Sequence, residues 1–272
     1  MKKEIGKKKS NKIKAILIIG LMLFVTGSVV ADQMQIFAKE ETPLSPLGAD
    51  ADEAGIHIGG AESMPVNTVE INSDSDDTYL FNTNPVYLTA HDSATGTSNS
   101  DFHSVSVGQY ILLIYIVSRG VLYFDTSSIP LGSEIISAKL TLVLSTDNSA
   151  TDFDVVIQNG MPTYPSKPAV ATDFLYSYYS GDGGSINTSA LPAVGNPFDI
   201  DLNDIGLGWI NKGGITKFMF RSSRDISSTP PTGLELIYFY AFDTGAPYIP
   251  KLTVEYTLTP IVHIRGGHIG GE

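Results

Sequence analysis

Residues 137–145, SAKLTLVLS, decide the fold class of this chain. Ala138, Leu140, Leu142 and Leu144 occupy alternate positions, and Lys, Thr and Val stand between them. A period of two is typical of a β-strand with one buried face, because successive side chains point to opposite sides of a sheet. We therefore expect a half-buried strand here.

Other segments on either side of this strand are also rich in β-branched and aromatic residues. We expect strands at residues 77–81, 85–90, 105–107, 110–117, 120–124, 153–158, 217–221, 234–242 and 251–256. One short helix is expected near residues 202–210, with Asp201 or Asn203 as its N-cap. Many short strands without alternating helices predict an all-β fold, an antiparallel sandwich or barrel.

The first 31 residues have the form of a secretory signal peptide. Seven lysines precede the apolar run 15–25, and Val29-x-Ala31 forms a cleavage site before Asp32. An uncleaved membrane anchor is the alternative, although the run is short for a span. We interpret residues 32–76 as an acidic flexible arm or linker, 77–257 as the β domain and 258–272 as a Gly-rich tail. A secreted or cell-surface location follows.

The charge balance limits the partners. The chain has 17 Lys and Arg, 29 Asp and Glu, and a net charge of −12. Residues 1–31 hold seven of the basic residues and one acid, so the chain from Asp32 onward carries ten basic and 28 acidic residues, a net charge of −18. Such acidity argues against nucleic acid as a partner. The absence of Cys excludes disulfides, thiolate metal sites and a thiol nucleophile.

Residues 119–140, RGVLYFDTSSIPLGSEIISAKL, carry a recognisable signature. An Arg precedes an apolar strand ending in Phe-Asp, and Ser-Ile-Pro, a Gly turn and Ile-x-Ser-Ala-x-Leu follow. This segment resembles the DNRLRE, or disaggregatase-related, domains of secreted bacterial and archaeal proteins. Weaker matches at 77–80, 198–202 with Trp209, and 250–256 extend the resemblance over roughly residues 77–257.

The resemblance implies a β-sandwich of jelly-roll type, with long loops around the short helix. It also implies a non-catalytic module, similar to a carbohydrate-binding module, that binds extracellular polysaccharide, including acidic glycans. Residues 160–197 depart from the family pattern because they are long, aromatic and Gly-rich. No ligand residues are therefore carried over from the family.

Flat aromatic rings and planar polar groups are what a sugar-binding site requires. We predict a ligand-binding face formed by Tyr176, Tyr178, Tyr179, Arg221 and Arg224. Guanidinium groups suit the carboxylates of uronic acids. The alternatives are that the tyrosines pack in the core and that Arg221 and Arg224 form an internal clasp with Asp225. For Trp209 a place in the core beside the short helix is the main interpretation, and a sugar platform is the alternative.

Closely spaced carboxylates make calcium the one cofactor to consider. The candidate metal ligands are Asp74, Asp76, Asp77, Asp147, Asp152 and Asp154. These residues form two clusters, at 74–77 and at 147–154, and neither matches the EF-hand loop. Solvated acidic turns are the alternative interpretation.

Catalysis finds little support, and we predict that the protein is not an enzyme. The sequence has no Gly-x-Ser-x-Gly elbow and no HExxH motif. The segment 90–104, with His91, Asp92 and His103, is where a His and an Asp can meet.

A rival hypothesis is a structural subunit of a cell surface, sheath or filament, in which arm 32–76 or tail 258–272 adds a strand to a neighbour's sheet, with calcium assisting. The predicted partners are thus polysaccharide or neighbouring subunits, with membrane contact only through an uncleaved signal segment.

Overall fold

The computed structural model describes residues 64–99 and 103–259. They form an all-β antiparallel sandwich of jelly-roll type, as the sequence predicts. The predicted signal segment, most of the predicted arm and nearly all of the predicted tail lie outside the described residues.

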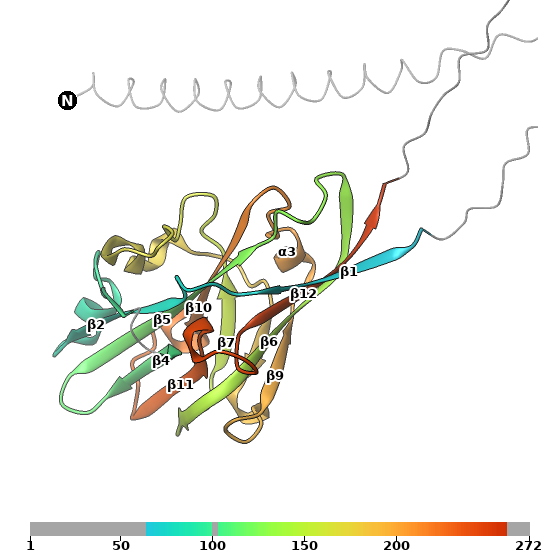
Figure 1. Ribbon diagram of the computed structural model, residues 1–272. Helices are drawn as coiled ribbons and strands as arrows, with labels where there is room; N and C mark the ends of the chain where they lie inside the picture. The colour runs from blue at the N-terminus through green and yellow to red at the C-terminus, as the bar shows by residue number, and fades with distance from the viewer. Residues whose placement is uncertain (1–63, 100–102, 260–272) are drawn as a thin grey trace, which may run out of the picture. The chain divides into compact units, whose positions relative to one another are not determined.

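Twelve strands make up the described sheets, and most of the expected strands are present (Figure 1). They are β1 (Val66–Asn72), β2 (Thr78–Asn84), β3 (Thr97–Asn99), β4 (Ser104–Ile111), β5 (Tyr115–Asp125), β6 (Ser133–Ser149), β7 (Asp154–Gln158), β8 (Ser185–Asn187), β9 (Pro197–Asp201), β10 (Ile215–Ser222), β11 (Leu234–Tyr240) and β12 (Lys251–Leu258).

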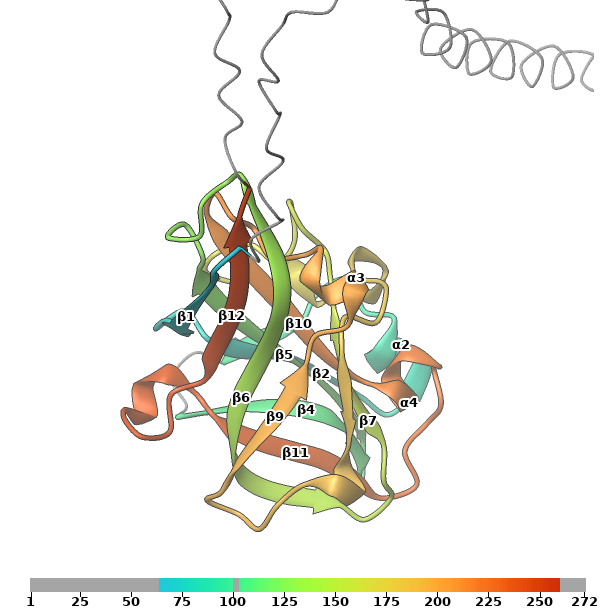
Figure 2. The same cartoon turned by 90° about the vertical axis from the view of Figure 1, so that its right-hand side faces the viewer.

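The long strand β6 belongs to two sheets. Its first part pairs with β12 and β9, and β1 completes this first sheet beside β12. Its last part pairs with β11, which begins the second sheet of β11, β4, β5, β10, β7 and β8. Strand β2 pairs with β5, and β3 pairs with β2. Figure 2 shows the first sheet in front, with β11 and β4 running across behind it.

The main core lies between these two layers. Leu140 and Leu252 of the first sheet belong to one cluster with Leu122, Phe218 and Phe239 of the second sheet, and all five are fully buried. The alternating apolar positions that the sequence analysis found at 137–145 provide part of this face.

A second apolar cluster covers the other face of the second sheet. Val121 and Tyr123 of β5 and Met219 of β10 pack here against Phe174 and Tyr179. The covering elements are helix α2 (Tyr87–His91) and the 3₁₀ turns that follow residue 170. Strand β5 is therefore buried on both faces, without interruption from Val117 to Phe124.

The described residues contain three short α-helices, whereas the sequence predicted one. The predicted helix is α3 (Asp204–Leu207), and its N-cap is Asn203, whose side chain accepts from two backbone amides. Helix α4 (Ser223–Ile226) follows β10 directly. None of the described helices has the length and apolar character needed to cross a membrane.

Helix α2 replaces the strand expected at residues 85–90. Its buried residues are Tyr87, Ala90 and His91, so burial recurs after three and four residues. That spacing is helical, and the β-branched and aromatic composition of the segment concealed it.

Two other strand boundaries differ from the expectations. Strand β1 lies within the segment interpreted as an arm, where it pairs with β12 over its whole length. The single strand expected at 110–117 is divided by a bend at residues 112–114, which joins β4 to β5. This bend contains none of the Gly, Pro, Asn or Asp residues that usually mark a turn.

Candidate functional site

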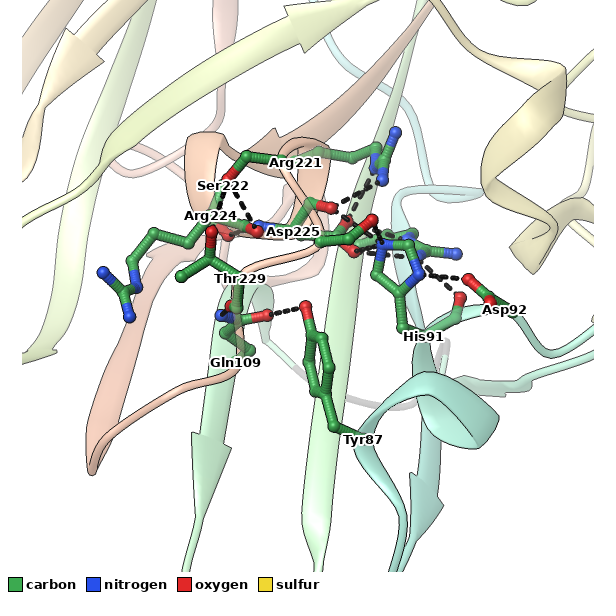
Figure 3. Close-up of polar contacts among 12 residues, drawn as sticks. Tyr87, His91, Asp92, Gln109, Arg221, Ser222, Arg224, Asp225 and Thr229 are labelled. Carbon is green, nitrogen blue, oxygen red and sulfur yellow. Dashed lines mark hydrogen bonds and ion pairs between the residues drawn. The ribbon is translucent and has the colours of Figure 1, made fainter.

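The predicted ligand-binding arginine Arg221 lies in the interior of the protein (Figure 3). Arg119 on β5 and Arg221 on β10 come from neighbouring strands, and both bind Asp225 of α4. Arg119 donates to both carboxylate oxygens of Asp225 at 2.8 and 2.9 Å, and Arg221 Nε donates to Oδ2 at 2.6 Å. The internal clasp that the sequence analysis left open is thus present for Arg221, with Arg119 rather than Arg224 as the second arginine on Asp225.

Two guanidinium groups surround the single carboxylate of this clasp. Burial by itself raises the pKa of Asp225, but the Arg119 and Arg221 guanidinium groups outweigh burial and hold this pKa well below its ordinary value. Arg221 also donates to Gln158 Oε1 at 2.9 Å. Its side chain is therefore fully engaged and does not face solvent.

Arg224 is also held by an internal acid. Its Nε donates to Glu235 Oε2 at 2.6 Å, and its Nη2 donates to the carbonyl of Pro230 at 3.0 Å. Glu235 is fully buried and accepts from the amide of Thr232 at 2.9 Å. Arg224 thus fastens the loop between α4 and β11, and 23% of its side chain is exposed.

The predicted tyrosines lie in and just after 3₁₀ turns and do not form one open face. Tyr179 is buried, and its hydroxyl donates to the carbonyl of Asp173 at 2.7 Å. Tyr178 is half-buried and stacks on Tyr164, with ring centroids 3.6 Å apart. Tyr176 covers His91, with 4.9 Å between the ring centroids. Tyr179 and Arg221 are therefore inaccessible to a ligand, which corrects this part of the predicted face.

His91 and Asp92 meet, as the sequence analysis anticipated. His91 Nδ1 contacts Asp92 Oδ1, and His91 Nε2 lies 2.8 Å from the carbonyl oxygen of Asp225. Ser228 Oγ is 3.5 Å from Nε2, which is longer than a nucleophile–base contact. His91 is 1% exposed, so this cluster ties α2 to α4 inside the protein.

The six predicted calcium ligands mostly have protein partners. Asp74 and Asp76 share the ammonium group of Lys167 at 2.7 and 2.6 Å. Asp77 is buried against backbone amides. The carboxylates of Asp147, Asp152 and Asp154 accept from Ser149, Thr188 and Asn187. Within the described ranges, no group of three or more His, Cys, Asp or Glu side chains is arranged to hold a metal.

An open groove lies beside Trp209, away from the predicted ligand-binding face. Its volume is about 510 Å³. Its lining comes mainly from the segment after β7 and the segment before β10: Leu131, Asn159, Met161, Pro162, Gly208, Trp209, Ile210, Asn211, Lys212 and Gly213. We call it the Trp209 groove. Because β7 and β10 are antiparallel neighbours, the end of one lies beside the start of the other, and this brings the two segments together.

Trp209 is held in place by close packing. The indole is half-buried and lies so near Gly183 that a Cβ added there would be 2.2 Å from the ring. The residue packs against the main core, as the main interpretation of the sequence had it, and it also lines an open groove.

The polar groups of the groove suit hydroxyl-rich ligands. Asn159 and Asn211 are among the lining residues, and their amide oxygens accept from the backbone amides of Met161 at 2.9 Å and Gly213 at 3.2 Å. Lys212 is the one charged side chain among the lining residues. Lys212 Nζ donates to the carbonyl of Ser133 at 2.6 Å, a residue outside the groove lining. Among the lining residues, the sequence analysis considered only Trp209 as a possible ligand-binding residue. The other lining residues belong to no sequence motif that indicates a binding site.

Comparison with known proteins gives little further information. No model of a known protein family matches the chain, and no curated protein matches it. Among solved structures, a chain in the cryo-EM structure of Mud crab tombus-like virus at 3.3 Å resolution is similar, with 14% identity and a TM-score of 0.25. The match covers 83% of this chain and 96% of that chain. Similarity at this level supports no inference about function.

Proposed function

We propose that this protein is a non-catalytic module that binds extracellular polysaccharide in the Trp209 groove. The observation that carries the proposal is the combination of a half-exposed indole with Asn159, Asn211 and Lys212 in one open depression. An indole face stacks on a sugar ring, while amides and an ammonium group bind hydroxyls and carboxylates. The resemblance to DNRLRE domains agrees with this activity.

Acidic glycans are the preferred class. The chain as a whole is acidic, so it repels polyanions except where a local positive charge faces the ligand. Lys212 supplies that charge, and the lining residues include no acid. Lys217 lies nearby, because its ammonium group donates to the carbonyl of Pro162, which also lines the groove, at 3.3 Å.

Isothermal titration with a uronic-acid polymer and a neutral polymer tests the proposal, with calcium and with a chelator. We expect saturable binding that Trp209→Ala and Lys212→Gln each weaken about tenfold, or about 1.4 kcal/mol. Tyr178→Ala serves as the matched control, because Tyr178 was predicted from sequence as a ligand residue but lies outside the groove. Binding that survives both groove variants, or binding lost only in Tyr178→Ala, would contradict this site.

A structural role is the second candidate, and one observation favours it. Strand β1 ends the order of the described strands, with β12 as its one ladder partner. An edge strand of this kind can accept a strand from a neighbouring copy. Size-exclusion of the same preparation separates the two functions, since stable oligomers without glycan binding would favour assembly.

A further inference from the structure

The bend between β4 and β5 is a protruding surface of leucine and isoleucine. Leu112, Leu113 and Ile114 are 73%, 96% and 38% exposed. Hairpin turns normally carry Gly, Asn or Asp, which tolerate the backbone geometry and interact with water. Three adjacent exposed aliphatic side chains at such a position are unusual and call for a partner.

Neighbouring elements extend this surface. Tyr110 of β4 pairs with Leu234 of β11, and the amide of Ile111 donates to the carbonyl of Gly233 at 3.1 Å. Tyr115 pairs with Asn84 and lies 5.6 Å from the ring of Tyr87, which places the start of α2 nearby. The exposed apolar residues of this end of the molecule, here called the apolar tip, are Val86, Leu88, Leu112, Leu113, Ile114 and Leu234.

The three segments that carry the apolar tip contain no charged residue. None of residues 78–90, 104–118 and 229–234 is Asp, Glu, Lys or Arg. The end of β6 adjoins them, because the amide of Ala150 donates to the carbonyl of Leu234 at 3.0 Å, and it brings the exposed Asp147 to the border of the tip. Such a charge-free region is notable in a chain with 46 charged residues. Tyr110 and Tyr115 flank the bend on either side and are half-buried.

We propose that the apolar tip docks this protein onto a lipid bilayer with zwitterionic headgroups. A hairpin that protrudes has no need of a matching pocket in a bilayer, because its side chains enter the boundary between headgroups and acyl chains. The flanking tyrosines suit the interface, where amphipathic rings gather. Without Lys or Arg in the three segments, the tip gains nothing from anionic lipids, and the acidic chain is repelled by them.

The placement of the tip agrees with docking. Figure 1 shows the β4–β5 turn at the lower left, at the end of the domain opposite the start of β1 and the end of β12. A bilayer at the tip therefore does not meet the start of β1 or the end of β12. The docking surface does not depend on the Trp209 groove, and it adds a membrane contact that the sequence analysis assigned only to an uncleaved signal segment.

Co-sedimentation with phosphatidylcholine vesicles tests the proposal, using the chain from Asp32 onward, which retains every described residue. We expect vesicle binding that the double variant Leu112→Asp/Leu113→Asp reduces at least tenfold. Leu112→Phe/Leu113→Phe should retain binding. Val194→Asp is the matched control, because Val194 is 56% exposed in a different loop. Circular dichroism checks that each variant is folded.

Several outcomes would overturn the proposal. The tip is not a lipid surface if the wild type stays in the supernatant, or if the double aspartate variant binds like the wild type. Stronger binding to phosphatidylserine vesicles would contradict the charge argument. A concentration-dependent dimer that the aspartate variant abolishes, without vesicle binding, would assign the tip to a second copy of the chain.

Discussion

Asp77 shows how the interior changes the behaviour of a single carboxyl group. It is 4% exposed, and its oxygens accept from the amides of Tyr123 at 3.3 Å and Phe242 at 3.4 Å. Burial raises the pKa of Asp77 from an ordinary value of 3.8 to about 8, and the amides offset this only in part. At neutral pH the folded protein therefore holds a proton on Asp77.

This proton makes stability depend on pH. Between about pH 4 and 8 the folded state keeps the proton and the unfolded state has released it, so unfolding becomes easier as pH rises. The contribution of protonated Asp77 to the stability of the fold is complete below about pH 4 and is lost as pH rises through about 8. We predict that the free energy of unfolding of Asp77→Asn falls less steeply with pH over this range than that of the wild type. The difference in slope is up to about 1.4 kcal/mol per pH unit.

Urea denaturation at pH 5, 6, 7 and 8 measures the effect. Asp243→Asn, which changes an exposed carboxyl group, is the control and should keep the wild-type slope. An unchanged slope in Asp77→Asn would show that Asp77 is ionised in the folded protein.

At the scale of elements, the docking of α3 shapes the Trp209 groove. A Cβ added to Gly206 of α3 would lie 2.0 Å from the carbonyl oxygen of Gly183. Gly183 in turn packs against the indole of Trp209. The position of α3 therefore depends on the positions of Gly183 and Trp209.

We predict that Gly206→Ala destabilises the protein by about 1–3 kcal/mol, because backbone atoms must separate to accept the methyl group. The displaced helix should also shift the fluorescence of Trp209, the one Trp in the sequence. Gly132→Ala is the matched control, since a Cβ added there would meet no atom within 4 Å. Equal melting temperatures and spectra for the two variants would disprove this close packing.

At the scale of the whole molecule, the second sheet holds the fold together. Strands β5 and β10 contribute to the apolar clusters on both of its faces. Arg119 and Arg221 of the same two strands bind Asp225, and Arg119 also donates to the carbonyls of His91 and Phe174. The covering elements are thus fastened to the strands that form the main core.

We predict that Asp225→Asn lowers the free energy of unfolding by about 3–5 kcal/mol, because it leaves buried guanidinium charges without their counterion. The Asp225→Asn variant should still unfold in a single transition, with the same midpoint by Trp209 fluorescence and by far-ultraviolet circular dichroism. Asp243→Asn again provides the exposed control. An early, separate transition would show that the covering elements unfold independently of the sandwich.

The sequence by itself determined the fold class and most strand positions. Alternation at 137–145 and at 251–256 is a local pattern, and it was enough to identify strands β6 and β12. The cap of α3 was equally local, because Asn203 and the amides it binds are neighbours in the chain. The helix α2 and the β4–β5 bend escaped prediction because their composition favours strands.

Only the tertiary structure decided which polar residues are accessible. Arg119 and Asp225 are 106 residues apart, so no local pattern reveals that they bind each other in the interior. Asn159 reaches the groove beside Trp209 because β7 pairs with β10. The physical reason is that alternation along a strand reports burial on one face of a sheet, whereas a site depends on which distant segments pack on either face.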